Sequence, residues 1–376
     1  MKAKSYLLRT LAISLGVSLL VMAVNYLVDP YGITGAARVP GLNQYKSEIN
    51  EHTRVLKKYQ PLFSTHNALI VGNSRVELGI APAHTCFQRA GMDVYNLGMP
   101  GAEVDTQLAY ALNLIYQQPI ETVFLSLDFT DFISTSAQPR PDAPNGLGSA
   151  SEEFRLLASG EENPDYYRVV LRDYFKSLYS LDALVASAKT VALQSSTSAD
   201  RDMAGFNPAR DFDEAVRIEG PRALFDQKMT SLTKKYSRPW YLRNTEGQLN
   251  VAVEELGQFL DIATARGITV YLFTNPFHEK FWELFRAQGH MPAYNDWLKS
   301  IEHLAAEYPG GLVQLWDFSG DSPYIHETVP AAGVRTGPLQ WFWEPAHYRR
   351  ELGDQMVDAM LSHGCDTGVS FGRQVF

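Results

Sequence analysis

Apolar residues in this chain form short continuous runs separated by longer stretches of helical periodicity. Five runs end at or just before a glycine, an asparagine or an aspartate, and they cover residues 68–71, 93–98, 122–127, 268–273 and 312–317. Uninterrupted apolar runs bounded by turn residues are typical of strands buried on both faces of a parallel sheet. The pattern therefore predicts about five buried strands.

Helical periodicity fills much of the sequence between these runs. Apolar residues spaced three or four apart predict helices over 106–116, 249–265, 279–288 and 293–307, and a last helix that continues through Leu361. Strands that alternate with helices are typical of α/β proteins in which helices cover both faces of the sheet. We expect an α/β fold with a doubly wound parallel sheet.

The alternation lapses between residues 134 and 245. Residues 134–153 are rich in Ser, Pro, Gly and Ala, which predicts a long surface loop, and residues 195–213 are polar and predict irregular structure. Residues 165–193 have a helical pattern with many aromatic side chains, which suit either a core or a lid over a groove. We interpret 134–245 as a mainly helical insertion in one α/β domain spanning 29–376.

The N-terminal segment is apolar from Tyr6 to Val28, about the length that crosses a hydrocarbon core. Lys2, Lys4 and Arg9 lie at its start, so the positive-inside rule places the N-terminus in the cytoplasm and the remainder outside. A cleaved signal peptide and a buried helix are the alternatives. Because the apolar run continues to Val28, we favour a retained transmembrane anchor over residues 1–28, in the cytoplasmic (inner) membrane, with a periplasmic or otherwise extracytoplasmic domain.

Composition excludes some functions and leaves others open. The formal net charge is −9 over 376 residues, and no cluster of Lys and Arg stands out, which argues against nucleic acid as a partner. Cys86 and Cys365 lack metal-ligand spacing, and their separation does not reveal whether they pair. His278-Glu279 lacks the second histidine of a zinc-binding helix. We expect neither a metal nor a cofactor.

A serine follows the first predicted strand, where residues 68–75 are ALIVGNSR. Ligands of parallel sheets bind outside the carboxyl ends of the strands, so Ser74 lies where a nucleophile would be useful. Its amide at a helix start, and the nearby Asn73, could donate hydrogen bonds to an oxyanion. Ser74 could equally be an ordinary helix cap.

A histidine and a carboxylate lie close together near the C-terminus, as Glu344 and His347. A nucleophilic serine needs a base, and the base needs a group that fixes its tautomer. Pro345 suits the first position of a helix, so we expect Glu344 and His347 in a first helical turn, with both side chains on one side. A plain helix start with His347 in solvent is the alternative.

Four motifs in this order resemble the SGNH, or GDSL-like, hydrolase superfamily. They are Asp29-Pro30-Tyr31-Gly32, Gly72-Asn73-Ser74-Arg75, Asn96-Leu97-Gly98-Met99-Pro100-Gly101 and Glu344-Pro345-Ala346-His347-Tyr348. The nearest likeness is to membrane-anchored bacterial members that accompany acyltransferases in polysaccharide or teichoic-acid modification, including alginate O-acetyltransferase-like proteins. This resemblance implies a flavodoxin-like sheet, Ser74 as nucleophile, Gly98 as an oxyanion amide and His347 as base.

Two departures from the family pattern matter. The usual aspartate before the histidine is Glu344, so Asp317 or a backbone carbonyl could orient His347 instead. The usual Gly-x-Asn-Asp block has no match, because the third strand continues into Asp128, which cannot donate a hydrogen bond while ionised. Asn73 or Asn275 could replace the missing asparagine.

The leading hypothesis is acyl transfer or ester hydrolysis on a cell-envelope or exported glycan, through an acyl-Ser74 intermediate. The resemblance implies a membrane-bound acyltransferase partner that supplies the acyl group. The alternative is a non-catalytic, membrane-anchored accessory protein that binds a glycan or such a partner.

Overall fold

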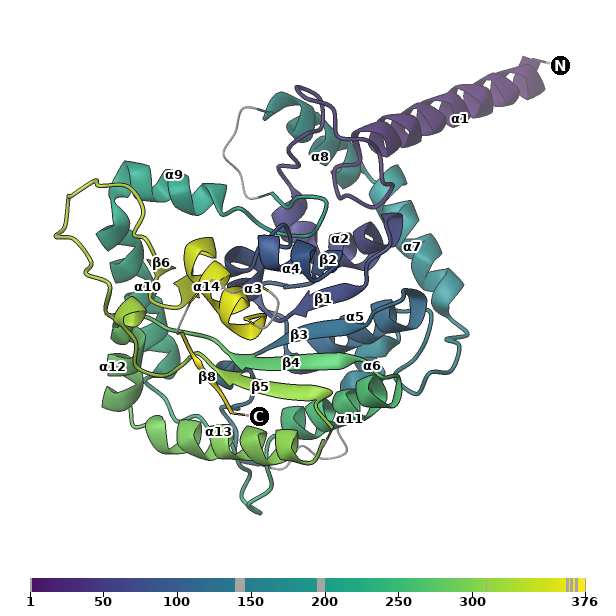
Figure 1. The fold of residues 1–376 in the computed structure, drawn as a ribbon. Helices are drawn as coiled ribbons and strands as arrows, with labels where there is room; N and C mark the ends of the chain where they lie inside the picture. The colour runs from purple at the N-terminus through teal and green to yellow at the C-terminus, as the bar shows by residue number, and fades with distance from the viewer. Residues whose placement is uncertain are drawn as a thin grey trace.

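A mostly parallel sheet forms the centre of the chain (Figure 1). The computed structural model describes residues 2–138, 146–194, 200–308, 310–362, 365, 368 and 371–375. Within these residues six strands pair in the order β2-β1-β3-β4-β5-β8. They are β1 (Ala68–Val71), β2 (Val94–Asn96), β3 (Thr122–Leu127), β4 (Thr269–Thr274), β5 (Val313–Asp317) and β8 (Arg373–Gln374). The expectation of an α/β chain with a mostly parallel sheet is confirmed.

The first five strands lie within the predicted apolar runs or extend one residue beyond them, and they run parallel. β8 was not predicted. It is a two-residue exposed strand that pairs antiparallel with β5 through Trp316 and Asp317, and it carries no apolar pattern.

The chain changes direction across the sheet after β2. β1 pairs with β2 on one side and with β3 on the other, so the connections that leave β1 and β3 diverge above their carboxyl ends. Such a switch point opens a crevice where ligands of parallel sheets bind. Ser74 follows β1 at this crevice, and Asp128 follows β3.

Helices cover the sheet on both sides (Figure 1). α3 (Ser74–Gly79) contacts α14 (Arg350–Met360), and α4 (Thr85–Arg89) lies near them. α5 (Val104–Gln117) and α11 (Val251–Ala265) contact each other and cover β1 and β4. α12 (Glu279–Ala287) and α13 (Met291–Ala306) follow β4, and α13 packs on β5. The predicted helices are therefore present, with ends displaced by a few residues.

The segment between β3 and α11 contains five described helices: α6 (Gly146–Ser151), α7 (Tyr166–Tyr179), α8 (Leu181–Ala192), α9 (Arg210–Glu219) and α10 (Pro221–Tyr236). α6 lies where a loop was expected. The helical stretch expected over 165–193 breaks at Ser180, because the Ser180 hydroxyl accepts the Ala183 N–H and caps α8. Irregular structure was expected over 195–213, but α9 already begins at Arg210, and residues 195–199 lie outside the described residues.

The remaining helices lie near the N-terminus or are single turns. α1 (Lys2–Val28) is long and apolar enough to cross a membrane. α2 (Thr53–Tyr59) is flanked by 3₁₀ turns. In the part of the chain that the structure describes, such turns cover Ile49–His52, Gln60–Phe63, Phe129–Asp131 and Pro323–His326.

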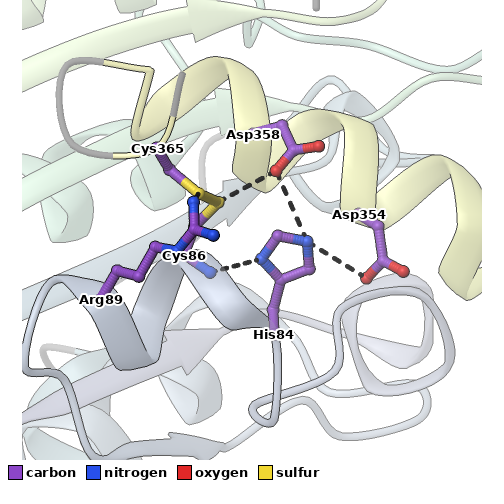
Figure 2. Close-up of a disulfide and its surroundings, with 6 residues drawn as sticks. All are labelled: His84, Cys86, Arg89, Asp354, Asp358 and Cys365. Atoms are coloured by element: carbon purple, nitrogen blue, oxygen red, sulfur yellow. Dashed lines mark hydrogen bonds and ion pairs between the residues drawn. A yellow bond between two sulfur atoms is a disulfide. The ribbon is translucent and has the colours of Figure 1, made fainter. Parts of the chain in front are cut away.

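A disulfide joins Cys86 of α4 to Cys365, which lies beyond α14 (Figure 2). Their Cα atoms are 5.4 Å apart and 279 positions separate them in the sequence. Polar atoms of His84, Cys86 and Asp358 lie within 4.8 Å of one another. Because a metal is bound by a thiolate and the Cys86 sulfur is already in a disulfide, this cluster lacks its sulfur ligand.

Candidate active site

Close packing at the end of β1 places Ser74 at the rim of the crevice. A Cβ on Gly72 would lie 2.8 Å from the Cβ of Ser126 in β3, so only glycine lets the two strand ends approach this closely. Asn73 caps α3, because its Oδ1 accepts the Arg75 N–H at 3.0 Å. The Ser74 hydroxyl is therefore not needed as the cap.

Ser74 and His347 are in direct contact. Ser74 Oγ lies 2.7 Å from His347 Nε2, although 273 positions separate the two residues in the sequence. Ser74 is partly exposed and His347 is buried. A serine hydroxyl that donates to an imidazole nitrogen, with one side open to solvent, has the geometry of a nucleophile and its base.

The expected helical turn at Glu344 and His347 is wrong. β6 (Phe342–Glu344) and β7 (His347–Tyr348) form an antiparallel hairpin in which Glu344 and His347 are paired residues. Pro345 and Ala346 form the turn between them, and α14 begins only at Arg350. The fixed φ of proline suits a tight turn as well as a helix start, and the local sequence does not separate the two.

The hairpin orients the imidazole through Glu344. One carboxylate oxygen, Oε1, accepts a hydrogen bond from His347 Nδ1, and the other, Oε2, accepts the Ala346 N–H at 2.8 Å. With Nδ1 as the donor, Nε2 is the nitrogen free to accept the Ser74 proton. Ser74, His347 and Glu344 thus form one hydrogen-bonded chain.

Burial and charge set the protonation of the pair. Burial lowers the pKa of His347 below its ordinary value, and the Glu344 carboxylate only partly opposes this effect. Burial alone would raise the pKa of Glu344, but His347, Lys228 and the Ala346 N–H lower it to about 2. At neutral pH the carboxylate is ionised and the imidazole is neutral, which is the state a general base requires.

The segment between β3 and α11 supplies side chains that sequence reasoning did not identify. Lys228 Nζ of α10 lies 3.3 Å from Glu344 Oε1, and the Phe212 ring of α9 lies 6.2 Å from the His347 ring. A cavity of about 320 Å³ opens here, lined by Phe212, Leu224, Gln227, Lys228, Ser231 and Glu344. Nothing in the local sequence of α9 or α10 indicates this position, because their placement depends on tertiary packing.

The insertion also fixes the helix that carries Ser74. Arg201 makes two hydrogen bonds of 2.9 Å to the two carboxylate oxygens of Glu77, which lies in α3 one turn after Ser74. Lys57 Nζ lies 3.7 Å from the same carboxylate, and all three side chains are buried. A buried carboxylate with two cationic partners and bidentate geometry holds α3 in one position.

The predicted oxyanion donors differ in what they already bind. The Gly98 N–H donates to Asn96 Oδ1 at 2.8 Å, and Asn73 Nδ2 donates to Asp128 and Asp131 at 2.9 and 3.0 Å. The Ser74 N–H lies in the first turn of α3, where amides have no partner within the helix. Ser74 is therefore the predicted donor whose amide needs no rearrangement to reach an oxyanion.

Two other candidates from the sequence lie outside the hydrogen-bonded chain. Asn275 Nδ2 donates to Ser126 Oγ at 2.7 Å, and Asp317 Oδ1 accepts the Thr274 hydroxyl at 2.8 Å. Glu344, and not Asp317, is the carboxylate that contacts His347.

Arg75 places a buried positive charge near the chain of three residues. Its guanidinium contacts the Asp128 carboxylate and lies 4.6 Å from the centre of the Phe277 ring. Its Nε is buried without a hydrogen-bond partner among the described residues. The Arg75 charge also contributes to lowering the pKa of His347, so it helps to keep the imidazole neutral.

Comparison with known proteins adds no relative to this picture. No protein-family model matches the chain, and no curated protein matches it.

Proposed function

We propose that this chain is an SGNH-type serine enzyme that transfers or hydrolyses acyl esters on a cell-envelope or exported glycan. The observation that carries the proposal is the hydrogen-bonded chain from Ser74 Oγ through His347 to Glu344. The strand order β2-β1-β3-β4-β5, which is that of flavodoxin-like sheets, supports the proposed fold family.

In the first half-reaction, Ser74 Oγ attacks the ester carbonyl while His347 Nε2 takes its proton. The tetrahedral oxyanion accepts a hydrogen bond from the Ser74 N–H. Collapse of this intermediate breaks the ester bond, and the leaving alcohol takes the proton from His347. An acyl group remains on Ser74.

In the second half-reaction, His347 deprotonates an acceptor that attacks the acyl-serine. A sugar hydroxyl as acceptor makes the protein an O-acyltransferase, and water makes it an esterase. The cavity beside Glu344 is the space in which an acceptor could be positioned. We propose that α1 anchors the enzyme in the inner membrane, with its α/β domain in the periplasm, where a membrane-bound acyltransferase partner supplies the acyl group.

The alternative is a non-catalytic accessory protein that binds a glycan or the acyltransferase partner. The amides of Gly98 and Asn73 favour it, because both already donate within the protein. The 2.7 Å contact between Ser74 and His347 favours the enzyme, because a site that has lost catalysis has no need to keep this distance.

Turnover of a simple acetyl ester tests the proposal. We expect Ser74→Ala to lower kcat by at least about 10⁴-fold, as loss of a triad nucleophile does. Ser237→Ala, which removes an exposed hydroxyl at the end of α10, is the matched control and should retain full activity. Activity that survives in Ser74→Ala would exclude Ser74 as the nucleophile, and an inactive wild type would favour the accessory protein.

A further inference from the structure

One face of α7 is exposed and carries two parallel stripes of side chains, one apolar and one basic. The apolar stripe consists of Tyr167, Leu171, Phe175 and Tyr179, and all four side chains are exposed. The basic stripe, one position further along, consists of Arg168, Arg172 and Lys176. Both stripes repeat every four residues, so each follows one side of the helix.

The opposite face of α7 packs against the protein. Asp173 and Ser177 are buried, and the Tyr174 hydroxyl donates to the Ile33 carbonyl at 3.2 Å. Tyr167, Leu171 and Phe175 are each more than half exposed, whereas Tyr179 at the end of the stripe contacts α1. An exposed stripe of aromatic and aliphatic side chains with basic residues beside it is typical of helices that lie in a membrane interface.

α7 lies beside the apolar helix α1 (Figure 1). The Tyr179 hydroxyl lies 3.0 Å from Ser18 Oγ, and Asn25 Nδ2 donates to the Leu178 carbonyl at 2.9 Å. Ser18 precedes the end of α1 by ten positions, or about 15 Å of helix. Tyr179 therefore reaches the level of the apolar part of α1.

The position of Tyr179 tells us which way the apolar stripe faces. Because Tyr179 ends the stripe and contacts α1 at the depth of Ser18, the stripe continues the exposed apolar surface of α1. Leu181, which begins α8, extends this surface and is also exposed. A surface continuous with a membrane-crossing helix faces the same lipid.

We infer that α7 lies in the interface of the outer leaflet of the membrane that α1 crosses. The apolar stripe enters the boundary of the acyl chains, and the basic stripe contacts anionic lipid headgroups. This inference rests on the proposed anchor and not on the proposed chemistry. By this inference the protein contacts the membrane through two helices, α1 and α7.

Probe accessibility in the full-length protein tests this placement. Phe175→Cys offers one reactive thiol, because the native cysteines are joined in a disulfide. The thiol is labelled with an environment-sensitive fluorophore, and the protein is reconstituted in vesicles of phosphatidylcholine and phosphatidylglycerol. We expect blue-shifted emission, quenching by doxyl-labelled lipid and protection from iodide.

Two matched positions serve as controls. Ile218→Cys on α9 has nearly the same exposed fraction as Phe175, 57% against 58%, and should be quenched by iodide but not by lipid. Leu19→Cys on α1 should be quenched by lipid. A Phe175 probe that behaves like the Ile218 probe, while the Leu19 probe is quenched by lipid, would overturn the inference.

The other outcomes are also decisive. If the Leu19 probe is not quenched by lipid, α1 is not in the bilayer and the inference fails with the anchor, while Ser74-dependent turnover in the same sample reports separately on the chemistry. Protection of Phe175 in native membranes but not in pure lipid vesicles would overturn the inference in favour of a protein partner.

Removal of positive charge from the basic stripe tests the inferred contact between this stripe and anionic lipid headgroups. Arg168→Gln with Lys176→Gln removes two cations from the basic stripe, of which Arg168 forms an exposed ion pair with Asp165. Arg172, which is paired with Glu153 and Asp173, stays in place. In vesicles with anionic lipid, we expect lipid quenching at Phe175 to fall to its level in phosphatidylcholine alone. Quenching unaffected by both the variant and the lipid charge would overturn the assignment of the basic stripe to anionic headgroups.

Discussion

The residue before Ser74 determines what the serine hydroxyl can do. A helix that begins after a strand needs a cap, and Asn73 provides it through Oδ1. The Ser74 hydroxyl can then bind His347, and the carboxylate of Glu344 fixes the tautomer of that imidazole. The proposed chemistry depends on the side chains of Ser74, His347 and Glu344. It also depends on the helix cap by Asn73, which leaves the Ser74 hydroxyl available to His347.

Lys228 offers a test of the electrostatics at this scale. Protonated His347 cannot accept the Ser74 proton, so kcat/KM should fall as the pH falls through the pKa of His347. Because burial lowers this pKa, the acid limb should lie below pH 6.5, the ordinary value for histidine. The Lys228 charge also lowers it, so Lys228→Met should raise the pKa and move the acid limb to higher pH.

The pH dependence of kcat/KM on an acetyl ester measures this shift. Lys234→Met on the same helix is the control, because Lys234 is exposed and should leave the acid limb in place. An acid limb that does not move in Lys228→Met, or that moves to lower pH, would contradict the assigned role of Lys228.

Some residues of the candidate site could be predicted from the sequence and others could not. Ser74, Glu344 and His347 could be predicted because each lies in a short motif next to a predicted strand or helix. Lys228 and Phe212 could not, because they reach the site from helices whose sequences carry no chemical motif. The occupied amides of Gly98 and Asn73 were also unpredictable, since hydrogen-bond partners depend on the folded geometry.

At the scale of elements, contact between α3 and α14 sets the distance between Ser74 and His347. α3 begins with Ser74, and α14 follows the hairpin that carries His347. A Cβ on Gly353 would lie 1.8 Å from the Gly79 carbonyl oxygen, and a Cβ on Gly79 would lie 2.0 Å from the Tyr348 ring. Glycine at position 353 allows α14 to approach α3 this closely, and glycine at position 79 allows α3 to approach Tyr348 of β7.

Gly353→Ala should separate α3 from α14 and displace Ser74 from His347. A misplacement of about 1 Å can lower a rate about 100-fold, so we expect a loss of kcat of this order. The control is Gly257→Ala in α11, where the nearest atom to the new Cβ lies 3.6 Å away, an ordinary contact.

Activity is measured per folded protein, well below the melting temperatures of the wild type and of each variant. Such a measurement separates misplacement of Ser74 from unfolding. Gly257→Ala should retain wild-type kcat. Wild-type kcat in Gly353→Ala would show that this helix contact does not position Ser74 against His347.

The elements themselves could be predicted where periodicity is strong. The five parallel strands and the helices after β2 and β4 follow from apolar runs and helical spacing. The hairpin at Glu344 could not, because Pro345 suits both a turn and a helix start, and distant packing decides between them. Phe342 and Tyr348 are buried in the core, and the Arg349 N–H donates to the Trp341 carbonyl at 2.7 Å, which closes the hairpin.

At the scale of the whole molecule, the order of strands brings the two ends of the α/β domain together. β1 lies between β2 and β3 in the sheet, and the helix that follows it, α3, packs against α14. The disulfide between Cys86 and Cys365 joins the same two regions. Pairing of these cysteines could not be predicted, because a separation of 279 positions does not indicate a distance in space.

Covalent labelling of Ser74 tests the central claim most directly. The protein is incubated with a fluorophosphonate, which reacts with an activated serine, and its intact mass is measured, followed by peptide mapping. We predict one adduct on Ser74 in the wild type, none in Ser74→Ala, and much slower labelling in His347→Gln. An unlabelled wild type, or an adduct that persists in Ser74→Ala, would contradict the claim that folding creates a nucleophile from Ser74 and His347.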